Sequence, residues 1–238
     1  NAFEQEQPIL LDQFKNKTSF SKHLTSLIKY ADFGISDVKS VSANIPSDIW
    51  HQFKEQMKTQ IGADEGKLEE AFNIKNATQL QFTHTGEDSS SAGFGLDNES
   101  RGTVAALSFF SLALRQLSRP TVTLIDEIDT SLHPALVAEL VALYTDPATN
   151  PHGSQLIFTT HDVSLINQSG SSNRLLQPDQ IWLVEKDKDG ASELFPVTEL
   201  GIRKEENIGK NYLNGVYGAT SNPSFHTVFA QIMNGDDD

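Results

Sequence analysis

Two adjacent carboxylates, Asp126 and Glu127, follow directly on the strand-forming run Thr121-Val-Thr-Leu-Ile. A buried parallel strand brings its last residues to the carboxyl edge of the sheet, where ligands of open α/β folds bind. Asp126 is therefore suited to hold Mg²⁺, which takes one or two carboxylates and keeps much of its water. Glu127 would face an attacking water and could orient or deprotonate it. The structural alternative is a strand followed by an acidic helix cap.

A second group, Ser100-Arg101-Gly102-Thr103, opens an apolar helix predicted over residues 104–117. The first turn of a helix leaves backbone N–H groups unpaired and carries a partial positive charge, so it can receive a phosphate. The alternative is a plain helix cap made by Ser100 or Thr103.

A third group, Thr160-His161-Asp162, follows a strand predicted over residues 155–159. A histidine at a strand end can reach a phosphate or a nucleophilic water, although a lone histidine is more often structural. The order of the three groups strengthens each of them. A glycine-bearing helix start is followed about 25 residues later by the Asp-Glu pair and about 35 residues after that by the histidine.

The surrounding sequence predicts the elements that would position these groups. Apolar strands alternate with helices, which favours an α/β fold with a mostly parallel sheet covered by flanking helices. The predicted elements after the helix at 104–117 are a strand at 121–125, a helix at 134–144, a strand at 155–159, a helix or turn at 163–167, a strand at 180–185 and its hairpin partner at 193–197.

Residues 1–76 are predicted to form a helical arm or lid, followed by a main lobe over 77–222 and a tail over 223–238. Within these regions the periodicity predicts helices at 21–31 and 47–61 and strands at 38–45 and 79–85. The Ser- and Gly-rich residues 86–95 are predicted to form a surface loop.

Composition limits the function. The chain has 238 residues, a formal net charge of −14 and no cysteine, so disulfides, cysteine–zinc sites and thiol nucleophiles are excluded. The acidic balance argues against strong, direct DNA binding by this lobe, because phosphate binding needs a basic surface. No apolar run reaches the ~18–20 residues of a membrane helix, and we expect a soluble protein of the cytoplasm.

The three groups together resemble the C-terminal half of an ATP-binding-cassette (ABC) ATPase head of the SMC type. Ser100-Arg101-Gly102-Thr103 is similar to the signature motif, with a departure from the usual Ser-Gly-Gly-Gln. Leu124-Ile125-Asp126-Glu127 resembles a Walker B motif with its catalytic glutamate. Ser131-Leu132-His133 resembles the D-loop, and Thr160-His161-Asp162 resembles the switch-histidine loop.

The run from Asp126 to Pro134 is also similar to stand-alone AAA-family ATPases of bacterial abortive-infection and phage-defence systems, of the RloA or AbiL kind. The similarity covers about residues 80–219. It implies ATP and Mg²⁺ as cofactors and a homodimer or higher homo-oligomer that sandwiches ATP. It also suggests a sensor or regulator subunit with a Toprim-like effector nuclease as its partner, and it implies no membrane partner.

The resemblance also assigns roles to single residues. Ser100, Gly102 and Thr103 would contact ATP held by a partner chain, and Asp126 would hold Mg²⁺. Glu127 and His161 would act in catalysis, on the attacking water and on the γ-phosphate respectively. The D-loop residues Ser131, Leu132 and His133 would adjoin the nucleotide.

The sequence departs from the family in one respect, because no Gly-x-x-x-x-Gly-Lys-Ser/Thr run occurs in it. This loop and its lysine cradle the phosphates in such heads, and ATP binding is expected to need them. Since the chain begins with Asn1 rather than Met, we expect it to begin inside a longer protein that supplies this half. The alternative is that a separate polypeptide supplies it.

Three alternatives remain open on the sequence. A metal hydrolase could use Asp126, Asp129, His133 and His161, although their spacing matches no known zinc pattern. The chain could belong to an SMC-like DNA-repair ATPase, or to a non-catalytic scaffold that binds ATP and holds an effector nuclease. The mixed-charge run at 203–206 is predicted to be a solvated surface or a contact with a partner subunit.

Overall fold

The computed structural model describes residues 2–31, 33–44, 52, 55–56, 76–86, 90–167, 174–203, 206–220 and 224–234. The chain divides into two compact units, each considered by itself below. The first comprises Asn1–Thr123, Thr130–His133 and His152–Gln155; the second comprises Leu124–Asp129, Pro134–Pro151 and Leu156–Asp238.

The first unit contains a three-stranded antiparallel sheet in the order β1 (Ile35–Asn44), β2 (Asn76–Thr85) and β3 (Ser91–Gly95). Strand β3 corrects the prediction of a loop over 86–95. Its glycines look loop-like in sequence, yet Gly93 and Gly95 pair with Thr83 and Gln81 of β2 in the antiparallel ladder.

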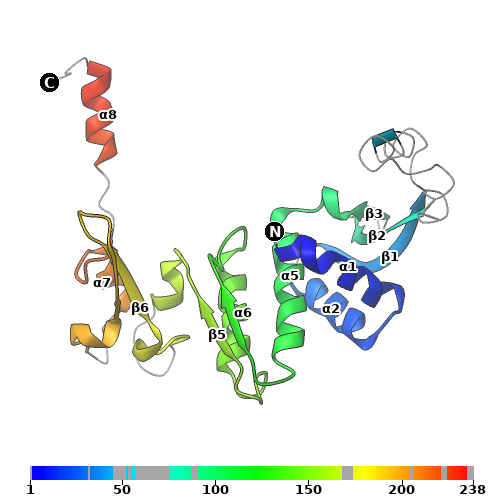
Figure 1. Ribbon diagram of the computed structural model, residues 1–238, viewed down its shortest axis with the longest axis horizontal. Coiled ribbons are helices and arrows are strands. Elements are labelled where there is room, and N and C mark those ends of the chain that lie inside the picture. The colour runs from blue at the N-terminus through cyan, green and yellow to red at the C-terminus, as the bar shows by residue number, and fades with distance from the viewer. Residues whose placement is uncertain are drawn as a thin grey trace. The chain divides into compact units, whose positions relative to one another are not determined.

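Helices α1 (Ala2–Lys15) and α2 (Ser19–Tyr30) pack against this sheet, and α5 (Arg101–Gln116) packs against these two helices (Figure 1). Apolar side chains at helical spacing, such as Leu24 and Ile28 of α2, are fully buried. Both α1 and α2 contact α5, and β1 pairs with β2 along its length. The described part of the predicted arm at 1–76 therefore shares one core with residues that follow it.

Strands β4 (Val122–Ile125) and β5 (Gln155–Phe158) form a second sheet, and helix α6 (Pro134–Thr145) connects them in the chain. The Gln155 N–H donates to the Thr121 carbonyl, and the Thr159 N–H donates to the Ile125 carbonyl. Because both bonds advance in the same direction along the two strands, the pair is parallel. The predicted α/β class is confirmed, with parallel strands at β4–β5 and antiparallel strands in the other two sheets.

The C-terminal part of the second unit is built on the antiparallel hairpin of β6 (Trp182–Lys186) and β7 (Ser192–Pro196). One face of the hairpin packs into a buried cluster of Ile181, Leu183, Val197, Ile208 and Tyr217. Helices α7 (Ile208–Leu213) and α8 (Phe225–Asn234) follow. Short 3₁₀ helices lie at Leu96–Asn98 (η1), Val163–Ile166 (η2), Pro178–Gln180 (η3) and Val197–Leu200 (η4).

Three described helices have no counterpart among the predicted elements. Helix α1 lies at the N-terminus, α7 follows the β6–β7 hairpin, and α8 lies within the predicted tail at 223–238. The predicted helix at 47–61 falls almost wholly outside the described residues. Across the described part of the chain, no helix combines the length and the apolar character needed to cross a membrane.

The core of the first unit should be sensitive to the loss of a single side chain. Leu107 of α5 is fully buried, whereas Leu213 at the end of α7 is 64% exposed. We expect Leu107→Ala to lower the free energy of unfolding by about 2–5 kcal/mol, because it removes apolar contacts and leaves a cavity. Denaturant titration measures this, with Leu213→Ala as the matched control. Equal effects of the two variants would contradict the described core.

Candidate functional site

Asp126 and Glu127 lie where β4 ends, beside the end of β5, as the sequence predicts. Thr159, the first residue after β5, forms hydrogen bonds to residues 126–128 with both its side chain and its backbone; we call this the β4–β5 corner. Its hydroxyl donates to Oδ1 of Asp126 over 2.5 Å and accepts from the Glu127 N–H over 2.8 Å. Its carbonyl accepts from the Ile128 N–H over 3.0 Å. The carboxylate pair is therefore held from the neighbouring strand.

The backbone at Glu127 has a positive φ of 51°, in the left-handed region that residues other than glycine rarely adopt. Such a conformation costs of order 1 kcal/mol or more and persists only where surrounding bonds hold it. Here the bonds to Thr159 from the Glu127 and Ile128 N–H groups hold it. Strain of this kind clusters at functional sites, and the exposed Glu127 side chain lies on this strained corner.

Asp129 organises the loop that carries His161. Its Oδ1 accepts from the Thr160 hydroxyl over 2.7 Å and from the His161 N–H over 3.3 Å. Burial alone would raise the pKa of Asp129, but these hydrogen bonds, its own backbone N–H and the charge of His161 lower its pKa below the ordinary value. Asp129 is thus kept ionised, and the His161 side chain lies exposed at the same strand edge.

The donor chemistry at this edge fits the Mg²⁺ that the resemblance to ABC-type heads implies. Mg²⁺ binds to proteins through one or two carboxylates together with water and substrate phosphates. The Asp126 carboxylate is exposed and accepts from Thr159 on Oδ1, and a carboxylate has about four lone-pair positions in all. No group of three or more His, Asp or Glu side chains converges on a metal position among the residues that the structure describes.

Ser100 is the N-cap of α5, and whether it also contacts a phosphate stays a prediction. Its hydroxyl accepts from the Thr103 N–H over 3.0 Å and lies 2.9 Å from the Thr103 hydroxyl. Ser100 is exposed, whereas Thr103 is 3% exposed and turned into the unit. Any ligand at this helix start would therefore meet Ser100 and the backbone rather than the Thr103 hydroxyl.

The first turn of α5 needs a glycine at position 102 because the backbone of Ser131 lies close to it. A Cβ added to Gly102 would lie 2.9 Å from the backbone carbonyl of Ser131, closer than real contacts allow. Ser131 also has a positive φ, of 67°. The predicted signature and D-loop segments thus touch each other within the first unit. Leu132 is half-buried and His133 is exposed beside them.

A hollow adjoins the start of α5 in the first unit. Glu99 is buried there and its Oε1 lies 2.8 Å from Nε2 of His84 on β2, while the His84 ring contacts Phe94 edge-on. These bonds fix the residue that precedes the N-cap. The hollow is lined by Phe33, His84, Phe94, Asn98, Glu99, Ser100 and Thr103.

The structure brings the predicted residues together in two groups. Asp126, Glu127 and His161 lie in the second unit. Ser100, Gly102, Thr103, Ser131, Leu132 and His133 lie in the first unit. The sequence analysis missed the anchoring roles of Thr159 and Asp129, and the signal that could have found them is a pair of threonines where an apolar strand ends.

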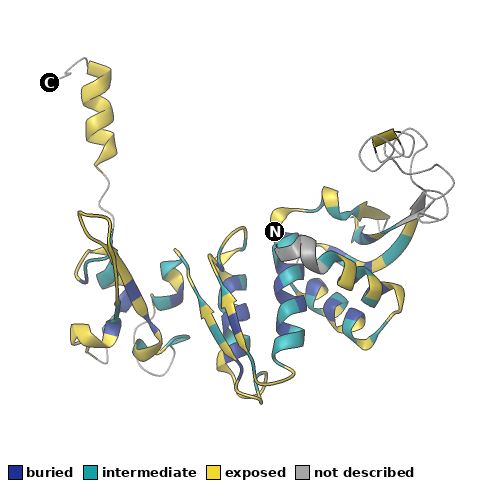
Figure 2. Ribbon diagram, in the orientation of Figure 1, coloured by how far each residue is buried: buried dark blue, intermediate teal, exposed yellow. Residues whose placement is uncertain are grey.

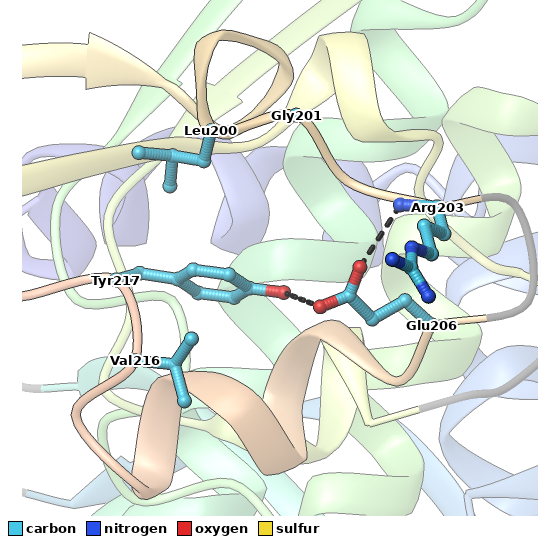
Figure 3. A pocket seen from close by; sticks show the side chains of 6 residues that line it. All are labelled: Leu200, Gly201, Arg203, Glu206, Val216 and Tyr217. Carbon is cyan, nitrogen blue, oxygen red and sulfur yellow. Dashed lines mark hydrogen bonds between the residues drawn. The ribbon is translucent and has the colours of Figure 1, made fainter.

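A second hollow, in the C-terminal part, contains none of the predicted site residues (Figure 3). Glu206 accepts from the Arg203 N–H over 2.9 Å and from the Tyr217 hydroxyl over 3.3 Å. Burial raises the pKa of Tyr217, an effect that the Asn211 hydrogen bond opposes and Glu206 reinforces. Glu206 is therefore half-buried and bound to its own chain, whereas Arg203 is exposed, as the solvated surface predicted for 203–206 requires. Residues 204 and 205 lie outside the described residues.

Comparison with known proteins decides the family. Residues 11–167 match the family described as "AAA domain, putative AbiEii toxin, Type IV TA system". The chain belongs to this AAA family. The matched range runs across the predicted arm boundary at residue 76 and contains every predicted site residue. Membership of the AAA family supports an ATPase-type, nucleotide-binding function for the chain.

Among solved structures, the chain is similar to the crystal structure of an SMC head bound to the C-terminal winged-helix domain of ScpA. The sequence identity is 16% and the TM-score is 0.41, and the similarity covers 77% of this chain and 43% of that one. The chain therefore spans less than half the length of this structure. No curated protein matches the chain.

Removing the Thr159 hydroxyl should destabilise the backbone turn at Asp126 and Glu127. Thr159→Val conserves shape but removes the hydrogen bonds to the Glu127 N–H and to Asp126. Because these bonds are exposed and water can partly replace them, we expect the free energy of unfolding to fall by about 0.5–1.5 kcal/mol. Denaturant titration measures the loss. Thr159→Ser keeps a hydroxyl and should restore most of it; a Ser variant as unstable as the Val variant would contradict the bridging role.

Asp129 should make stability depend on pH in the acid range. Since its pKa is lower folded than unfolded, its ionised form stabilises the fold above about pH 4, and this stabilisation disappears as the pH falls through the folded-state pKa. The stability difference between wild type and Asp129→Asn should therefore be largest at neutral pH and narrow in acid. Denaturant titrations at several pH values measure it, and a difference independent of pH would contradict the assignment.

Proposed function

We propose that this AAA-family chain supplies the hydrolytic residues of an ATPase site that a phosphate-binding loop completes. Asp126 would hold Mg²⁺ directly or through water. Glu127 would orient the attacking water and accept its proton, and His161 would contact the γ-phosphate. When bound, the metal would neutralise charge on the phosphates, which is a main part of catalysis in phosphoryl transfer.

The corner formed by Asp126, Glu127 and Thr159 carries this proposal. The two carboxylates lie at the carboxyl edge of a parallel strand pair, which is where open α/β sheets bind ligands. The strained backbone at Glu127 is fixed by bonds to Thr159, so the carboxylate would need little reorganisation before reaction. Asp129 holds the His161 backbone at the same edge.

An exposed apolar face supports the view that further polypeptide completes the fold. Val122, Leu124 and Ile157 of β4 and β5 are 57%, 74% and 56% exposed. Parallel sheets are ordinarily covered on both faces, so a covering layer is expected over these side chains. We propose that this layer includes the Gly-x-x-x-x-Gly-Lys-Ser/Thr loop that the 238 residues lack.

The start of α5 would act in trans within a homodimer. Ser100 is exposed at the N-terminus of a 16-residue helix, whose unpaired N–H groups favour an anion. We propose that Ser100 and Gly102 contact the γ-phosphate of ATP held by a second copy, with the segment at Ser131 beside them. The close approach of Gly102 to Ser131 would couple the two segments.

The biological role we propose is defence against phage in the cytoplasm. The family description names a toxin of a type IV toxin–antitoxin system, which supports a conflict-related role over general DNA repair. In this role the ATPase would regulate an effector nuclease. The net charge of −14 argues against strong DNA binding by this chain itself.

Replacing Glu127 tests the catalytic assignment in the assembly that contains the phosphate-binding loop. We expect Glu127→Gln to lower the rate of ATP hydrolysis by about 10²–10⁴-fold, because the water loses its base, while ATP binding persists. Glu139→Gln, at an exposed position of α6, is the control and should retain full activity. Undiminished hydrolysis by Glu127→Gln would remove Glu127 from the mechanism. Loss of hydrolysis with intact defence would show that ATP acts only as a conformational ligand.

A further inference from the structure

The C-terminal helix α8 carries an apolar stripe that its own chain leaves uncovered. Its large apolar residues recur at helical spacing, and each is at least half exposed: Phe225, Val228, Phe229, Ile232 and Met233. All ten residues of α8 are exposed, and Figure 2 shows the whole helix in the colour of exposed residues. A single-sided stripe of this kind is typical of a helix that packs on an apolar surface.

Length strengthens the argument that α8 has a docking surface. An isolated helix shorter than about 12–15 residues is only marginally stable in water. Forming its first turn is unfavourable, and a short helix has few backbone hydrogen bonds to offset this. Helix α8 has ten residues. Its helical form therefore depends on contacts that the described residues of one chain do not supply.

The outer face of the β6–β7 hairpin is a matching uncovered surface. Trp182, Val184 and Leu194 share this face, because Val184 pairs directly with Leu194 and Trp182 pairs with Pro196. The three side chains are 53–60% exposed. Five-residue strands span about 17 Å, and a ten-residue helix spans about 15 Å, so α8 can cover the face from end to end.

We propose that α8 of one copy covers the outer face of the β6–β7 hairpin of a second copy, and that the exchange is reciprocal. A two-fold dimer makes each such contact twice. This contact needs no nucleotide and is separate from the proposed ATP sandwich, so it goes beyond the proposed function.

The area available favours this reciprocal exchange over a simple pair of α8 helices. Covering the exposed parts of two Phe, one Trp and five aliphatic side chains removes on the order of 700 Å² per contact. Two contacts remove about 1,400 Å², within the ~1,200–2,000 Å² of stable interfaces. An α8–α8 pair alone would fall below that range and would leave both hairpin faces open.

Disulfide trapping tests the proposed contact in the full chain without nucleotide. Because the sequence contains no cysteine, only the introduced cysteines can form a disulfide. Two separately tagged variants, Val184→Cys and Ile232→Cys, are mixed and oxidised. We expect a mixed disulfide-linked dimer carrying both tags. Thr227 lies on the polar side of α8, so Thr227→Cys in place of Ile232→Cys should reduce the yield at least tenfold.

Light scattering on the eluting protein provides an independent readout. The wild-type chain should have twice the 26.2 kDa chain mass; Phe229→Asp should become monomeric, and the control Thr227→Asp should remain dimeric. A monomeric wild-type chain would overturn the proposal. So would a Val184→Cys/Ile232→Cys double variant that links only within one chain, or a dimer that Phe229→Asp leaves intact. None of these results depends on whether Glu127 supports hydrolysis.

Discussion

The hydroxyl of Thr159 is the contact on which the candidate site depends. It accepts a hydrogen bond from the Glu127 N–H and donates one to the Asp126 carboxylate. These bonds join the end of β5 to the two acidic residues that follow β4. Without this bridge the left-handed turn at Glu127 would lose one of the bonds that hold it. The parallel pairing of β4 and β5 places Thr159 opposite that turn.

The same edge gathers three carboxylates, those of Asp126, Glu127 and Asp129. Asp129 stays ionised through bonds from Thr160 and His161, while Asp126 and Glu127 remain exposed. In a chain with a net charge of −14, such a cluster is unfavourable unless a cation or donor groups compensate it. Hydroxyl and amide donors compensate part of the charge here, and Mg²⁺ with its bound phosphates would compensate more.

Much of the fold could be predicted because local patterns carry it. The apolar runs that end in Asp126 and in Thr160 predict β4 and β5, and the Ser100 cap marks the start of α5 within a few residues. The bridges from Thr159 and Asp129 could not be predicted, since they join residues more than 30 positions apart. Strand β3 was missed because its glycines resemble a turn in sequence, whereas its pairing with β2 makes it a strand. Helix α8 was missed although its residues repeat at helical spacing.

We propose above all that Asp126 and Glu127 at the β4–β5 edge act in ATP hydrolysis. A crystal structure of the complete assembly with Mg²⁺ and a non-hydrolysable ATP analogue tests this most directly. The quantity to measure is the distance from the Asp126 carboxylate to the metal. We predict that an Asp126 carboxylate oxygen contacts Mg²⁺ directly at about 2.0–2.1 Å, or through one water. Glu127 should face the water that lies in line with the γ-phosphate. A nucleotide bound elsewhere, with Asp126 and Glu127 contacting neither metal nor water near the γ-phosphate, would contradict it.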